Sequence, residues 1–356
     1  MNRLVSVALL ILTVNVVCQP LTKAQQRRPS TEPVGAVKEN KSSPDSIREL
    51  LWWLPEDTET ISVVRGPFKV VARGEPSEDM SAKDYVDLAL HQTPLGCLGI
   101  IKDGAFLKHF IGRTVSFCVE GSRRFRPPSS LGGMRFEGCS IVMLEQDLAE
   151  RTALLNQMVS QAKVFHNLEG HRVAEFEEKL EQDTWKFLVA MPAPNVLLCA
   201  TNQEFLAEVL NRITRRGARR ALPETLPEWK HINTEARFWA VRHYDVSNAK
   251  NDPSSPLSGE QAAANWPDTQ AIGIVFDFDP ARSKVATVRY LSRTEKGLRS
   301  FSDEMKKASY PGQDFKPQFH QPEPGIVEMA VSLVENEQAG MFLFVLLMLL
   351  GHGVYV

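Results

Sequence analysis

Short runs of alternating apolar and polar residues recur along most of the chain, and most of them end at turn-forming residues. This period is typical of β-strands with one buried face. Helical stripes interrupt the runs at about every second or third strand, a spacing that favours an α+β fold. We therefore expect a mostly antiparallel sheet with helices packed on one face. The expected strands cover residues 60–71, 114–120, 139–144, 163–177 (a hairpin), 185–191, 196–200, 237–246, 271–278, 284–291 and 326–334.

The expected helices have clear start signals. Thr201–Glu204 resembles a capping box, and the apolar stripe behind it consists of Phe205, Leu206, Val209, Leu210 and Ile213. Further helices are predicted at residues 47–51, 81–89, 147–159 and 295–308. Residues 310–324 are rich in proline and are expected to be irregular.

Two segments of the chain resemble each other at a constant offset of 55 residues. Ile141–Leu144 and the stripe at residues 154–158 align with Val196–Cys199 and the stripe at residues 209–213. Each segment places an apolar strand before a capped helix. The match indicates either a repeated strand–helix unit or a chance similarity between two amphipathic helices.

The N-terminal 24 residues have the layout of a secretory signal peptide. Arg3 precedes the apolar run Leu4–Val17, and Thr22-Lys23-Ala24 places small residues before a cut after Ala24. The polar segment that follows is predicted to be a disordered linker. We expect a signal peptide at 1–24, a linker at 25–45 and a globular region at 46–356, either undivided or in two halves of about 46–225 and 226–356.

Composition narrows the class of protein. A chain of 356 residues with 43% hydrophobic and 24% charged residues is ordinary for a globular protein that folds around its own core. Its formal net charge is −2. Loss of Arg3 and Lys23 with the signal peptide makes that charge more negative, so we expect no nucleic-acid partner.

Four cysteines remain after removal of the signal peptide: Cys97, Cys118, Cys139 and Cys199. In an exported protein they are either disulfide-bonded or small buried apolar residues. Cys118 and Cys139 lie in two expected strands that could pair, so they are the candidate bridge. Since the globular region is large enough to bury a core, we expect that no disulfide is needed to hold the fold together.

Three residues of the 163–177 hairpin form the candidate metal site. With a turn at Glu169-Gly170, both His166 and His171 face the same side, and Glu169 lies between them. Two imidazoles and a carboxylate are ligands that zinc accepts. The alternative is a pair of histidines on a solvated hairpin. A second acidic pair, Asp277 and Asp279, lies at a strand end and is either a cation or acid–base site or an ordinary turn flank.

Five arginines crowd the end of the helix that begins near Asn202 and form the candidate anion site: Arg212, Arg215, Arg216, Arg219 and Arg220. Guanidinium groups bind phosphate or sulfate through paired hydrogen bonds. The alternative is a solvated helix end, where positive charge interacts favourably with the helix dipole.

The C-terminal segment Ala339–Val356 carries no acidic residue, lysine or arginine, and Met341–Leu350 is apolar without interruption. Eighteen residues are at the lower limit for a membrane span, and no basic residue follows them. We expect a helix packed against the domain. The alternative is membrane association through residues 339–356.

No sequence motif defines a reaction, and we expect no cofactor. The sequence predicts an exported globular protein with a structural, binding or envelope-associated role. The two alternatives are an extracytoplasmic hydrolase, with or without a metal ion, and a membrane-tethered envelope protein.

Overall fold

A computed structural model describes residues 46–69, 114–125, 135–145, 162, 164–180, 183–215, 219–243, 271–279, 285–307 and 318–332. All of them belong to one compact unit, Ser43–Val354. Several predictions fall on residues outside these ranges: the signal peptide, the linker, the helices at 81–89 and 147–159, Cys97 and the segment 339–356.

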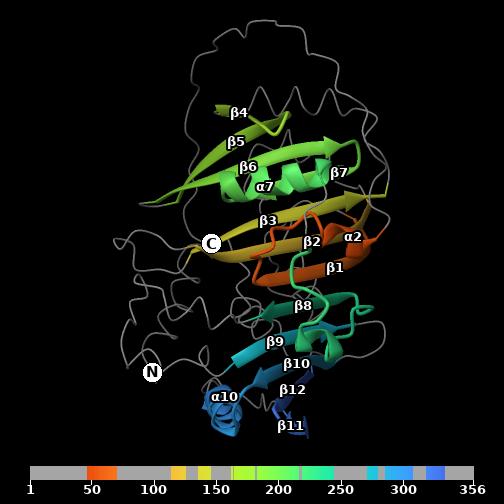
Figure 1. Cartoon of the computed structure of the whole chain (residues 1–356), viewed down its shortest axis with the longest axis vertical. Coiled ribbons are helices and arrows are strands. Elements are labelled where there is room, and N and C mark those ends of the chain that lie inside the picture. The colour runs from red at the N-terminus through yellow and green to blue at the C-terminus, as the bar shows by residue number, and fades with distance from the viewer. Residues whose placement is uncertain are drawn as a thin grey trace, which may run out of the picture. The chain divides into compact units, whose positions relative to one another are not determined.

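The described strands form one twelve-stranded sheet in the order β11-β12-β10-β9-β8-β1-β2-β3-β7-β6-β5-β4 (Figure 1). Every pairing in this order is antiparallel. The strands are β1 Thr60–Lys69, β2 Thr114–Phe125, β3 Arg135–Leu144, β4 Val164–Leu168, β5 His171–Leu180, β6 Asp183–Ala193, β7 Val196–Ala200, β8 Phe238–His243, β9 Ala271–Phe278, β10 Val285–Ser292, β11 Gln318–Glu323 and β12 Ile326–Ser332.

The predicted α+β class is wrong, because the described part of the chain is dominated by this one sheet. Its helical elements are α2 Ile47–Leu50, α7 Gln203–Thr214, α10 Glu295–Lys307 and the 3-10 turn η1 Pro227–Lys230. The single large sheet results from pairing between strands that are distant in sequence. Local sequence patterns identify individual strands, but they do not show that all the strands join into one ladder.

The strand order repeats about the central β1–β8 pair. On one side β8, β9 and β10 follow in sequence, and the β11–β12 hairpin is then added beyond β10. On the other side β1, β2 and β3 follow in sequence, and the β6–β7 hairpin is added beyond β3. In each half a short helical element precedes the first strand and contacts the second: α2 contacts β2, and η1 contacts β9. The β4–β5 hairpin extends only one half.

The two segments that resemble each other at an offset of 55 residues lie side by side in the sheet. Its two strands, β3 and β7, are direct antiparallel neighbours, with Ile141 opposite Leu198. The helix of the second segment is α7. Its cap is Asn202, whose side chain accepts a hydrogen bond from the Phe205 amide at 2.9 Å. The predicted helix of the first segment lies outside the described residues.

One face of the sheet carries the main core. Leu50 and Leu54, together with Phe205 and Val209 of α7, pack there on strand residues such as Ile141. Gly121 allows the close approach, because a Cβ at this position would lie 2.6 Å from a methyl carbon of Leu54. Burial of these apolar side chains is the main source of stability for this face.

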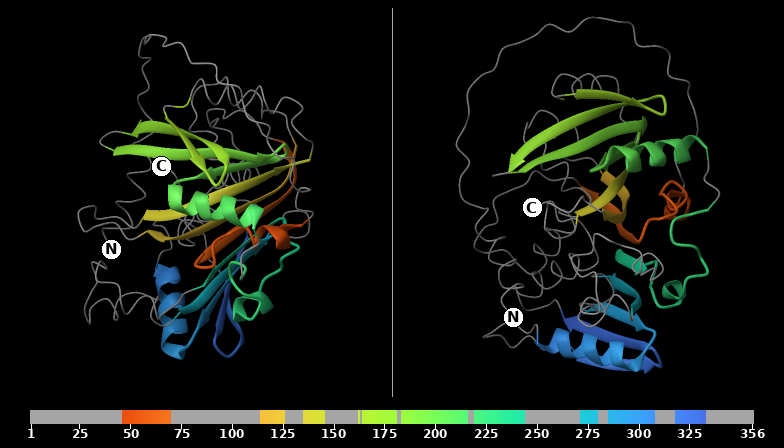
Figure 2. Two further views of the ribbon diagram at one scale, coloured as in Figure 1. Left: turned by 45° about the horizontal axis from the view of Figure 1, so that its top comes forward. Right: turned by 60° about the vertical axis from the view of Figure 1, so that its left-hand side comes forward.

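The other face carries α10, so the prediction that all helices pack on one face is also wrong (Figure 2). Tyr290 stacks on Phe301 of α10 at a ring separation of 4.4 Å, and both residues are buried. Leu291, the next residue of β10, belongs to the core on the α7 side. Tyr290 and Leu291 are successive residues and face opposite sides, so β10 has buried apolar side chains on both faces, and each needs a cover.

The proposed Cys118–Cys139 bridge is wrong for a geometric reason. Cys118 lies opposite Val142 and Cys139 lies opposite Gly121 in the β2–β3 pair. Val142 and Cys139 are three residues apart, so the two thiols point to opposite faces of the sheet. Cys118, Cys139 and Cys199 are all buried.

Local predictions succeeded in several places and failed in others. The strands at 196–200 and 271–278 have the predicted bounds, and the hairpin turn lies at Glu169-Gly170. Residues 318–323, which were expected to be irregular, form the edge strand β11. Its sequence contains Pro322 and shows no apolar alternation, so the strand depends on pairing with β12.

A buried carboxyl group at the centre of the sheet gives a testable pH dependence. Glu120 lies between Ser62 on β1 and Ser140 on β3, and all three are buried. Burial disfavours the carboxylate and raises the pKa of Glu120 from 4.5 to about 8.

We therefore predict that the protein becomes less stable as the pH rises from about 4.5 to about 8. Over this range the unfolded chain releases the Glu120 proton while the folded chain retains it, which costs about 5 kcal/mol in full. Glu120→Gln should lack this contribution and should be more stable than the wild type at pH 8. Urea unfolding across this pH range measures the effect, and the same pH slope in both proteins would contradict it.

Candidate functional site

The β4–β5 hairpin carries the residues of the predicted metal site. Leu168 lies opposite His171 and His166 lies opposite Val173, which confirms that both histidines face the same side. Glu169 and Gly170 form the turn with positive φ angles of 51° and 77°, as a two-residue hairpin loop requires. Glu169 is exposed at the tip of this turn.

The carboxylate that contacts His166 belongs to Glu175 and not to Glu169. Nε2 of His166 lies 2.6 Å from Oε2 of Glu175, and Nζ of Lys186 donates to the other carboxylate oxygen at 2.8 Å. The three residues come from β4, β5 and β6, so this network joins three adjacent strands. Among the described residues, no group of three or more His, Cys, Asp and Glu residues has the geometry to hold a metal ion.

The Glu175 network is electrostatically balanced. Burial alone would raise the pKa of Glu175, but hydrogen bonds and charge interactions with Lys186 and His166 outweigh it and lower that pKa. The carboxylate is therefore ionised at neutral pH and neutralised by its neighbours. This arrangement fastens the outer hairpin to the sheet.

The predicted arginine cluster divides into two groups. Arg215 and Arg219 are exposed beyond the end of α7, whereas Arg212 and Arg220 are buried. Arg216 lies outside the described residues. Arg212 donates to Glu208 at 3.0 Å and to the carbonyl oxygen of Arg219 at 2.8 Å. Arg212 thus fixes the chain that leaves α7.

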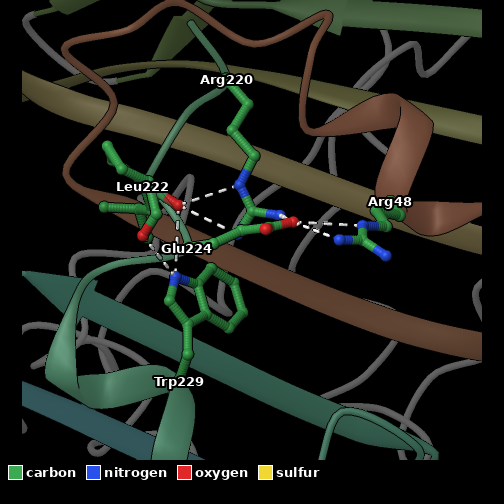
Figure 3. A network of polar contacts seen from close by, with 6 residues as sticks. Arg48, Arg220, Leu222, Glu224 and Trp229 are labelled. Atoms are coloured by element: carbon green, nitrogen blue, oxygen red, sulfur yellow. Dashed lines mark hydrogen bonds and ion pairs between the residues drawn. The ribbon is translucent and has the colours of Figure 1, made fainter.

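Arg220 is the centre of a second network (Figure 3). Its guanidinium donates to the carbonyl of Leu222 at 3.1 and 3.2 Å and to Glu224 at 3.0 Å, and it lies 4.9 Å from the centre of the Trp229 ring. Arg48 donates to the same Glu224 oxygen. Burial lowers the pKa of Arg220, and nearby Arg48 adds to this, against the opposing charge of Glu224. The network joins α2 to the segment that leads into η1.

A buried acid–histidine pair lies next to this segment, and sequence analysis missed it. Oε1 of Glu228 lies 2.6 Å from Nδ1 of His243. Glu228 is completely buried, whereas the His243 side chain is 24% exposed. Gly273 makes room for the carboxylate, because a Cβ there would lie 2.2 Å from Oε1 of Glu228.

This pair can orient an imidazole. A carboxylate that accepts a hydrogen bond from Nδ1–H fixes the tautomer and leaves Nε2 available as a base. Oε2 of Glu228 is also buried, and no hydrogen-bond donor reaches it among the described residues. No local sequence signal links the two residues, since they are brought together by η1 packing on β9.

Comparisons with protein family models, curated proteins and solved structures found no match for this chain. Across the described ranges, no helix has the length and apolar composition needed to cross a membrane.

The two groups of arginines predict two different mutant phenotypes. Arg215→Ala combined with Arg219→Ala should weaken retention on a heparin column and leave the melting temperature unchanged, because both side chains are exposed. Arg220→Ala should lower the free energy of unfolding on the order of 2 kcal/mol through its lost hydrogen bonds. Unchanged heparin elution of the double variant would reject anion binding and leave the solvated helix end.

Proposed function

We propose that this chain is an exported globular protein with a structural or binding role at the cell envelope or outside the cell. The N-terminal layout supports export. The observation that supports a structural role is that buried charged side chains link neighbouring segments of the chain. In the described residues several buried ionisable side chains form bonded sets that join neighbouring segments, as Glu175 does for β4, β5 and β6.

The same pattern recurs at the far end of the sheet. Arg289 on β10 donates to Asp277 on β9 at 2.8 Å and to Glu328 on β12 at 2.7 Å, so one guanidinium links three adjacent strands. Asp277, a candidate for cation binding or acid–base chemistry from its sequence, is engaged in this link. Partly buried charge pairs of this kind position strands relative to one another, which suits a rigid scaffold.

Export is tested by the mature N-terminus. We expect protein isolated from the native host to begin at Gln25, because the small residues Thr22 and Ala24 define the cut. N-terminal sequencing after cell fractionation measures this directly. Cytosolic protein that retains Met1 would contradict export.

One observation favours hydrolase activity as a second candidate function. The Glu228–His243 pair has the carboxylate–imidazole geometry that orients a general base in hydrolases. In a hydrolase, His243 would accept a proton from a nucleophile or water, and Glu228 would hold the imidazole in position and stabilise its charged form.

The two functions are distinguished by turnover assays on the mature chain. Chromogenic carboxyl esters, phosphate esters, glycosides and peptides serve as substrates, with His243→Gln as the test variant and His231→Gln as the matched control. The side chain of His231 contacts Glu323 at 3.2 Å and not the dyad, and the substitution keeps the bond from its backbone N–H to the carbonyl oxygen of Glu228. A structural or binding role predicts no turnover that depends on His243. A loss of about a hundredfold in the His243 variant alone would establish the hydrolase instead.

A further inference from the structure

The two edges of the sheet differ in how they are protected against further pairing. β11 forms one edge and β4 the other (Figure 1). β11 contains Pro322, which has no N–H group, the acidic Glu323, and a register irregularity between His320 and Glu323. Proline, charge and irregular pairing are the features by which natural proteins block edge strands.

β4 has none of these protective features. Its sequence, Val-Phe-His-Asn-Leu, contains no proline, aspartate, glutamate, lysine or arginine, and its register with β5 is regular from Val164 to Leu168. Val164 and Asn167 are exposed, and the side chain of Val164 is a large apolar group in contact with solvent. β4 is the last strand of the sheet among the described strands.

The hairpin geometry shows which backbone groups face outward. Leu168 and His171 flank a two-residue turn and therefore form a hydrogen-bonded pair. Alternation along the strand then directs the N–H and C=O groups of Leu168, His166 and Val164 toward β5. The corresponding groups of Phe165 and Asn167 point away from the sheet, where another strand would bond to them.

We propose that β4 pairs antiparallel with β4 of a second copy of this chain. A two-fold axis through His166 places Phe165 opposite Asn167 of the second copy, which is a hydrogen-bonded pair. The same axis places Val164 opposite Leu168 of the second copy, which is an apolar cross-strand pair. Glutamate, aspartate, lysine and arginine are absent from the strand, so no like charges of these types oppose each other across the axis.

A second copy suits this edge better than an unlimited stack of copies. Because no described strand pairs with the outer edge of β4 and β11 is blocked, the described sheet offers one pairing edge, and the contact closes at two subunits. A five-residue strand pair makes a small interface, so the dimer is weak and depends on concentration. The inference is independent of the structural or binding role proposed above, since a hydrolase with the same edge would pair in the same way.

The test uses the mature chain in sedimentation equilibrium over a wide range of protein concentrations. The wild type should pass from monomer to dimer, with no larger species. Asn167→Pro removes one outward N–H from each copy while leaving the bonds to β5 in place, and it should weaken dimerisation by about tenfold. Asn167→Thr keeps the N–H and serves as the matched control, and Gln318→Pro controls for proline on the β11 edge.

A second variant and a second measurement keep the test valid if the Asn167→Pro variant misfolds. Val164→Lys places a charge on the same edge without restricting the backbone, and it should also weaken the dimer. Hydrogen exchange should slow at the amides of Phe165 and Asn167 as wild-type concentration rises. A wild type that stays monomeric, a dimer unaffected by both β4 variants, or growth beyond two subunits would overturn the proposal.

Discussion

The pairing of β1 with β8 is the contact on which the whole sheet depends. It joins two runs of strands that are distant in sequence, with Thr60 opposite Arg242 and Val64 opposite Phe238. Backbone hydrogen bonds continue beyond both ends of the pair, from Arg65 to Arg237 at 2.7 Å and from His243 to Glu59 at 2.9 Å. Among the described strands no other pairing connects the two halves, so without it each half would expose a new edge.

The two faces of this central pair carry different kinds of residue. Ile61 and Trp239 contribute to the core beneath α2, α7 and η1, so one side of the pair is apolar and buried. The opposite side carries buried polar residues, including Ser62, Glu120 and Arg242. Burial disfavours the charged form of Glu120 and raises the pKa of its carboxyl group. Nearer the two ends of the sheet, ion pairs link neighbouring strands.

Sequence analysis could predict the elements and could not predict their assembly. The alternation of residues 271–278 and the cap at Asn202 are local signals, and both identified the correct element. The β1–β8 pairing has no local signal, because any two amphipathic strands could pair in that way. β11 was missed because its order comes from β12 and not from its own composition.

The same distinction applies to the candidate sites. Counting along the hairpin correctly placed His166 and His171 on one face, but attention to neighbours in sequence selected Glu169 as the carboxylate. The hairpin register that aligned the histidines also places Glu175 opposite Val164, on the same face as His166. The register of this one hairpin is therefore enough to identify Glu175 as the carboxylate beside His166. Glu228 and His243, in contrast, meet only through the packing of η1 against β9, and no register derived from one hairpin could have joined them.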